Sequence, residues 1–181
     1  GSFSQYSLNY HRMMLDTLSI CEIWREKLNL KEFTSVFYQN ATLATNWLYQ
    51  MVCPLTGEVP NLGANDGSLL LQLTDSDYGD YRPCVNLASS LFINKSAYLE
   101  KGLWDLHLAW LGVENKESKS LSYENCDFDC GGYKIMRSHN SKVIFKFPKF
   151  TYIMNWEIFL FGKHSTKLLH DNKILRVENC D

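Results

Sequence analysis

The sequence predicts an α+β fold in which a helical segment precedes a segment of antiparallel strands. Apolar residues recur at helical spacing in residues 1–112, and they alternate with polar residues in 127–181. A charged, serine-rich stretch, residues 113–126, separates the two patterns and is predicted to be a linker. Segregation of helices from strands is typical of α+β chains and of two-domain chains.

Composition restricts the classes of function. The chain has 181 residues, of which 45% are hydrophobic, so it can bury a core and is not predominantly disordered. Its 18 Lys and Arg residues nearly balance 20 Asp and Glu residues, so no basic surface for nucleic acid is expected. No apolar run approaches the roughly 20 residues that cross a bilayer, so membrane insertion is not expected either.

Four helices share the helical spacing: residues 9–31, 41–52, 83–92 and 96–111. Ser7 or Asn9 is a suitable N-cap for the first helix, Pro54 ends the second, and Pro83 fits the first turn of the third. The apolar positions of the first helix predict its buried face: Met14, Leu15, Leu18, Cys21, Trp24 and Leu28. Successive helices are expected to stack as hairpins.

Strands are predicted in the last third of the chain. The segments "GGYKIMRS" (131–138) and "KVIFKFPKF" (142–150) alternate, and "HNS" supplies a turn between them. The segment "YIMNWEIFLFGKH" continues the pattern, and "KILRV" is a candidate short strand.

Six cysteines are scattered along the chain, and three lie within apolar-periodic segments, which favours reduced, buried thiols. Cys126 and Cys130, in "CDFDC", lack a partner pair at zinc-binding spacing, so loop cysteines are favoured over a metal site. No phosphate-binding glycine loop and no nucleophile elbow occurs, and no metal or cofactor is predicted.

The connection "PLTGEVPNLGANDGSLLLQLTDSDYGDYRP" (54–83) is the most unusual stretch, because such long connections are commonly functional. Asn65 and Asp66 precede a glycine in a strong turn signal, and Tyr81 and Arg82 follow. Tyrosine rings lie against sugar faces, and arginine binds carboxylates or sulfates, so these four residues are candidates for binding carbohydrate. Alternatively, Asp66 and Arg82 pair with each other and brace the loop.

Three segments together closely resemble the heparinase II/III-like polysaccharide lyases: "GSFSQYSLNYHRMMLDTL", "PNLGANDGSLLLQLTDSDYGDYRPCVNLASSLF" and "GGYKIMRS". They cover residues 1 to about 140. The resemblance implies that residues 1–112 are the last helices of an α/α toroid and that 127–181 begin an antiparallel β-sandwich, diverged after about residue 150. The chain, which begins with Gly1 rather than Met, is thus expected to be a fragment.

The resemblance also implies a reaction, cleavage of uronic-acid-containing polysaccharide by β-elimination. Tyr10 is the position expected to transfer the proton, with His11 a weaker candidate. A tyrosine whose pKa is about 10 needs a neighbouring cation to act as a base at neutral pH, and Arg82 is one candidate if the loop returns to the first helix. Without the resemblance, Tyr10 would be expected to pack at the helix start and His11 to lie at the surface.

The family pattern also includes an Asn or His on an earlier toroid helix and a His on the sandwich. The first lies in no segment of this chain, and neither His164 nor His170 fits the second, so the chain alone is expected to be a poor catalyst.

Two other hypotheses remain open. One is a non-catalytic protein, derived from such a lyase, that binds acidic carbohydrate or serves as a scaffold. The other is a helical module that self-associates through open helix faces and sheet edges. The resemblance implies a bacterial envelope or periplasmic location and an acidic polysaccharide as partner, while the cysteine pattern keeps the cytoplasm open.

Overall fold

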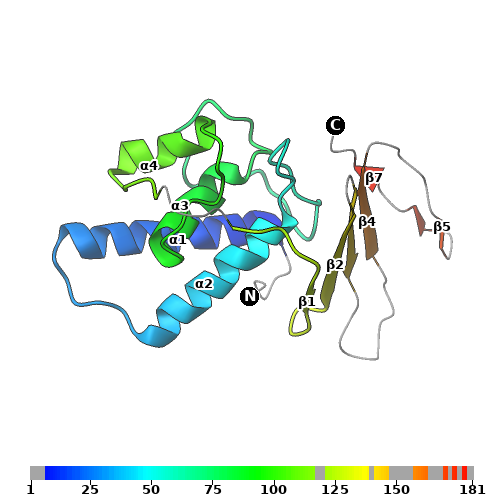
Figure 1. Cartoon of the computed structure of the whole chain (residues 1–181), viewed down its shortest axis with the longest axis horizontal. Coiled ribbons are helices and arrows are strands. Elements are labelled where there is room, and N and C mark those ends of the chain that lie inside the picture. The colour runs from blue at the N-terminus through cyan, green and yellow to red at the C-terminus, as the bar shows by residue number, and fades with distance from the viewer. Residues whose placement is uncertain are drawn as a thin grey trace. The chain divides into compact units, whose positions relative to one another are not determined.

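The computed structural model describes residues 7–116, 121–138 and 141–146, together with the backbone of strands at 157–162, 169–170, 173–174 and 177–178. The fold is mixed α+β, as predicted, with helices first and strands after them (Figure 1). The chain forms two compact units, Gly1–Ser122 and Tyr123–Asp181, and each is described by itself.

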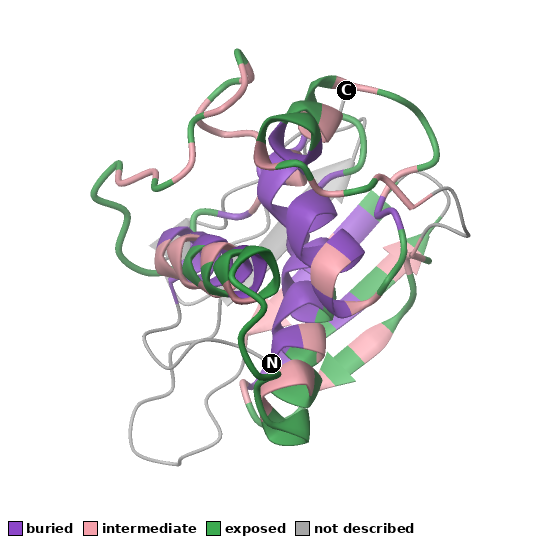
Figure 2. Cartoon of the chain, turned by 90° about the vertical axis from the view of Figure 1, so that its left-hand side faces the viewer, coloured by how far each residue is buried: buried purple, intermediate pink, exposed green. Residues whose placement is uncertain are grey.

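The first unit is helical in its described part. Its helices are α1 (Leu8–Lys27), α2 (Ser35–Met51), α3 (Arg82–Phe92), the 3₁₀ turn η1 (Leu103–Asp105) and α4 (Leu106–Leu111). Helix α3 packs against both α1 and α2, and almost all of its residues are buried. Figure 2 shows buried residues gathered where the helices face one another and exposed residues on the outer turns.

Side-chain caps explain where two helices begin. The hydroxyl of Ser7 accepts a hydrogen bond from the Tyr10 N–H at 3.1 Å, so the predicted cap of α1 is confirmed. Thr34 caps α2 by accepting from the Phe37 N–H at 3.3 Å, and the helix therefore starts earlier than predicted. The predicted helix over 96–111 is wrong in its first part, because helical structure begins only at Leu103.

The buried face of α1 is mainly polar, contrary to the prediction. Its buried polar residues are Asn9, His11, Arg12, Asp16, Ser19 and Glu22. Trp24 and Leu28, which were predicted to be buried, are 64% and 65% exposed. Leu15 lies in the core as predicted. The helix therefore contributes hydrogen-bonding groups to the interior, and each needs a partner there.

Ile23, Leu87 and Leu108 form one apolar cluster of the core, and Leu15, Trp47 and Leu48 are buried as well. Other large apolar side chains are exposed, including Leu30, Val36, Leu99 and Trp110. Self-association through these side chains stays a prediction. None of the helices in the described ranges has both the length and the apolar character that crossing a membrane would require.

The second unit contains a five-stranded sheet in the order β1-β2-β3-β4-β7 and a two-stranded sheet of β5 and β6. The strands are β1 (Cys126–Phe128), β2 (Tyr133–Ser138), β3 (Ser141–Lys146), β4 (Glu157–Gly162), β5 (Leu169–His170), β6 (Lys173–Ile174) and β7 (Val177–Glu178). The predicted hairpin is confirmed, since Ile135 of β2 pairs with Ile144 of β3 in an antiparallel register.

Strands β1 to β4 are antiparallel neighbours, whereas β4 and β7 pair in parallel. Both Ile135 and Ile144 are fully buried. Completion of a toroid by the helices and of a sandwich by the sheets stays a prediction. His164 lies outside the described residues, and only the backbone of His170, in β5, is described.

Candidate functional site

The first turn of α1 and the 54–83 connection meet at the surface of the helical unit. The Leu8 N–H donates to the Leu62 carbonyl at 3.1 Å, and the Ser7 hydroxyl donates to the Ala64 carbonyl at 2.5 Å. These two bonds fix the loop beside the helix start. They bring together polar side chains that lie far apart in the sequence.

Five of these side chains, Asn9, Tyr10, Asn65, Asp66 and Tyr78, form what we call the surface network. The Tyr10 hydroxyl donates to Asp66 Oδ2 at 2.8 Å, and Asn9 Nδ2 donates to Asp66 Oδ1 at 3.2 Å. The Tyr78 hydroxyl lies 2.6 Å from Asn65 Oδ1 and 2.9 Å from Asn9 Oδ1. Asn65 and Asp66 also accept backbone N–H groups of their own turn, as the Asn-Asp-Gly signal predicts.

Arg12 supports the surface network from below. Its side chain is buried, with Nη2 donating to Asn9 Oδ1 at 2.9 Å and Nη1 donating to the Tyr78 carbonyl at 2.7 Å. Its guanidinium carbon lies 4.5 Å from the centre of the Tyr78 ring and 4.2 Å from that of Tyr81, which are cation–π distances. Arg12 was not predicted as a site residue, although it follows the predicted pair Tyr10 and His11 directly.

Tyr81 was predicted to contact substrate, but the structure buries it at 4% exposure beneath the loop. Burial is the main cause that raises the pKa of this phenol to about 12. Tyr81 thus stacks on Arg12 inside the protein and does not present its ring to a ligand at the surface.

The electrostatics of the surface network keep Tyr10 protonated. Hydrogen bonds from Ser68 and then from Tyr10 lower the pKa of Asp66 to about 2. The same hydrogen bond to Asp66, followed by the negative charge of Asp66, raises the pKa of Tyr10. At neutral pH the pair is therefore a phenol that donates to a carboxylate. No cation among the described residues lowers the pKa of Tyr10.

His11 lies in the interface between α1 and α2 and is fully buried. Its Nε2 is 2.9 Å from the Ala44 carbonyl, and its ring centre is 4.6 Å from that of Trp47. Desolvation lowers its pKa to about 4, so the imidazole is neutral and Nε2 carries the proton that bonds Ala44. The expectation that His11 lies at the surface is wrong, and its position allows no direct contact with a substrate.

Arg82 braces the loop by a different pairing from the one predicted. Its Nε and Nη2 donate to the two carboxylate oxygens of Asp80, both at 2.9 Å, and Nη1 donates to the Leu55 carbonyl at 3.0 Å. Its guanidinium also stacks on Trp104 at 4.3 Å. The predicted pairing of Asp66 with Arg82 is wrong because each residue has its own partner.

At the surface the network offers a donor at Tyr10 and acceptors at Asp66 and Asn65, which is the mixture that binds sugar hydroxyls, while the buried Asn9 holds Asp66 and Tyr78 in place. In the described part of the chain, no three His, Cys, Asp or Glu side chains are close enough to share a metal ion. Comparison with protein-family models, with curated proteins and with solved structures gives no match.

Proposed function

We propose that the surface network forms part of the substrate cleft of a polysaccharide lyase that cleaves uronic-acid-containing polysaccharide by β-elimination. The supporting observation is the bond between Tyr10 and Asp66, which joins residues 56 positions apart in the sequence. The two residues belong to two of the segments that carry the family resemblance. Their meeting places a solvent-accessible phenol among groups that bind hydroxyls.

In this proposal Tyr10 transfers a proton to the leaving glycosidic oxygen. β-Elimination removes the proton at C5, forms the C4–C5 double bond, breaks the bond to the glycosidic oxygen and leaves that oxygen protonated. A protonated Tyr10 is suited to deliver the last proton, while Asn65 and Asp66 hold neighbouring hydroxyls, and the C5 proton then passes to a base outside the described residues. Removal of the C5 proton by Tyr10 requires a cation to offset Asp66, and such a cation would have to come from outside the described residues.

A second candidate is the non-catalytic carbohydrate-binding or scaffold protein. One observation favours it: the carboxylate of Asp66 raises the pKa of Tyr10, whereas a tyrosine base needs a lowered pKa. In that case the surface network binds sugar hydroxyls and the glycosidic bond stays intact.

Binding and cleavage measured together distinguish the two candidates. The chain, within its full-length parent where one exists, is titrated calorimetrically with oligosaccharides from several uronic-acid polysaccharides, and the same mixtures are analysed by mass spectrometry for unsaturated ends. Binding with unsaturated product supports the lyase, and binding without product supports the second candidate. Absence of binding contradicts both.

A further inference from the structure

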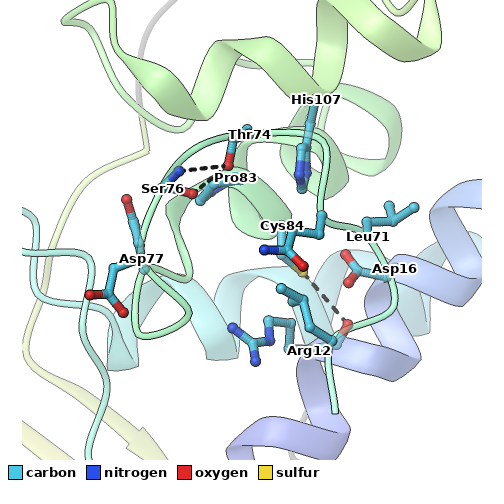
Figure 3. Close-up of a pocket in the computed structure, with 12 residues that line it drawn as sticks. Arg12, Asp16, Leu71, Thr74, Ser76, Asp77, Pro83, Cys84 and His107 are labelled. Atoms are coloured by element: carbon cyan, nitrogen blue, oxygen red, sulfur yellow. Dashed lines mark hydrogen bonds between the residues drawn. The ribbon is translucent and has the colours of Figure 1, made fainter. Parts of the chain in front are cut away.

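A small hollow lies under the loop at residues 69–80, between α1, α3 and α4 (Figure 3). Its volume is about 20 Å³, which is room for about one water molecule. The residues that matter for its chemistry are Arg12 and Asp16 of α1, Cys84 of α3 and His107 of α4. The hollow is separate from the surface network, but Arg12, which lines the hollow, bonds to Asn9 and Tyr78 of that network.

Several buried polar atoms of the described residues that line the hollow lack hydrogen-bond partners. Among the described residues, no hydrogen bond of normal geometry reaches either carboxylate oxygen of Asp16, Nδ1 of His107 or Nε of Arg12. Asp16 is 1% exposed and His107 is 3% exposed. In Figure 3 the Asp16 carboxylate and the His107 ring both point into the hollow. Buried polar groups of this kind are normally paired, often through an ordered water.

Charged and titratable groups face Asp16 from each neighbouring element. Hydrogen bonding by the Cys84 thiol of α3 and by the Leu71 backbone lowers the pKa of Asp16, although the Cys84 thiol is directed at the Arg12 carbonyl, 3.7 Å away. Asp77 and Asp80 of the loop also line the hollow. Asp77 accepts from its own turn and Asp80 accepts from Arg82, so neither carboxylate is turned toward Asp16.

Two titration shifts agree with this geometry. Burial is the main cause that raises the pKa of Asp16 to about 7, and Arg12 opposes it. Burial lowers the pKa of His107 to about 4. Near neutral pH, His107 is therefore a neutral acceptor, and Asp16 is present in both its protonated and its ionised form.

We propose that one water molecule in the hollow joins Asp16 to His107, and that the negative charge of Asp16 holds Arg12 in place beneath the surface network. Without its proton, Asp16 offsets the buried positive charge of Arg12, which then keeps its bonds to Asn9 and Tyr78. When Asp16 is protonated, Arg12 is buried without an opposite charge, and its bonds to Asn9 and Tyr78 weaken. Asp16 is thus a positioning residue for the surface network, and its influence on sugar affinity rests on the proposed function.

The variant Asp16→Asn tests the proposal, because it keeps the shape of the side chain and removes the charge. Glu22→Gln is the matched control, since Glu22 is a buried carboxylate on the same helix that pairs with Arg25 and Tyr38 outside the hollow. In the whole chain, we expect the ¹⁵N signal of Arg12 Nε to shift with pH, with its midpoint near 7. The shift should vanish in Asp16→Asn and persist in Glu22→Gln.

An unchanged Arg12 signal across this pH range in the wild type, or the same shift in Asp16→Asn, overturns the proposal. So does a high-resolution crystal structure in which no water bridges Asp16 and His107. The wild-type titration needs no variant, so misfolding of Asp16→Asn does not prevent the test.

Sugar binding gives an independent readout. If the surface network binds oligosaccharide, Asp16→Asn should weaken the affinity about fivefold at pH 8 and leave it unchanged at pH 5. Equal affinity at pH 8 contradicts the positioning role. If no oligosaccharide binds the wild type, the proposed function fails while the Arg12 titration still decides the inference.

Discussion

Tyr10 and Arg12 lie two residues apart on α1, yet one faces solvent and the other lies buried beneath it. Asn9 connects them, because its side chain accepts from Arg12 and donates to the carboxylate that holds Tyr10. Tyr10, Asn65 and Asp66 could be singled out from the sequence because turn signals and the family resemblance mark them. Arg12 could not, because its role depends on a loop that returns to α1 over 66 residues.

Replacement of Asp66 by Asn should lower the pKa of Tyr10. The Asp66 carboxylate accepts a hydrogen bond from the phenol and repels a phenolate. The amide of Asn accepts this hydrogen bond less well and does not repel a phenolate. The measurement is a pH titration of the Tyr10 ¹³Cζ signal. Asp75→Asn, at an exposed position of the same loop, is the control. A Tyr10 pKa that stays the same in Asp66→Asn would show that the bond is absent in solution.

Among the elements, residues 54–81 of the connection are ordered without helix or strand because they are fastened at several points. The Tyr81 N–H donates to the Gly57 carbonyl at 2.9 Å, and Arg82 and Asp80 form a bidentate pair against this turn. Local signals predicted the turn at Asn65 and Asp66. They could not predict the partner of Arg82, because several acidic residues lie within reach along the sequence.

Gly57→Ala should destabilise the helical unit by about 2 kcal/mol or more. Gly57 has φ +81°, and a Cβ there would overlap the Asp80 carboxylate and approach Arg82 Nε to 2.8 Å. Gly67→Ala is the matched control, since Gly67 has φ +78° but open space around its Cβ position. We expect only about 1 kcal/mol for the control, measured by urea unfolding. Equal losses of stability in the two variants would mean that Asp80 and Arg82 can move away from the new methyl group at no cost in free energy.

Helix α1 shows why its buried face was predicted incorrectly. Periodicity assigns apolar residues to the interior, but here Arg12, Asp16 and Glu22 are buried while Trp24 is exposed. Arg12 bonds to the loop, and His11 and Glu22 bond to α2, and such long-range pairing leaves no periodic signal in the sequence. Nothing in the described part of the helical unit explains why these apolar side chains are exposed.

At the scale of the whole molecule, the change from helical spacing of apolar residues to alternating apolar and polar residues correctly predicted the α+β class and the β2–β3 hairpin of the sheet. The parallel pairing of β4 with β7 could not be predicted, because it depends on how distant strands meet. Net stability at this scale reflects buried titratable groups that the fold keeps neutral. Asp16, His11, His107 and Cys84 are described residues whose pKa values burial shifts toward the neutral form.

Asp16→Asn should raise the free energy of unfolding above pH 7 and leave it unchanged below pH 4. The folded state raises the pKa of Asp16 from its ordinary value to about 7, so the unfolded chain holds fewer protons between those values. The cost of ionising Asp16 therefore grows as pH rises and reaches at most about 4 kcal/mol. Thermal unfolding at pH 4 and pH 8 checks this, and a variant that gains no stability at pH 8 contradicts the assigned burial.

The most direct test of the central claim is the rate at which the chain, within its full-length parent where one exists, forms unsaturated uronic-acid ends. The rate is followed by the ultraviolet absorbance of the new double bond in the wild type, in Tyr10→Phe and in Tyr38→Phe. Tyr38 is the control because its hydroxyl also bonds a carboxylate, that of Glu22, away from the surface network. We expect Tyr10→Phe to lose at least about 100-fold in rate and Tyr38→Phe to keep it. Equal rates in all three proteins would contradict the assignment of proton transfer to Tyr10.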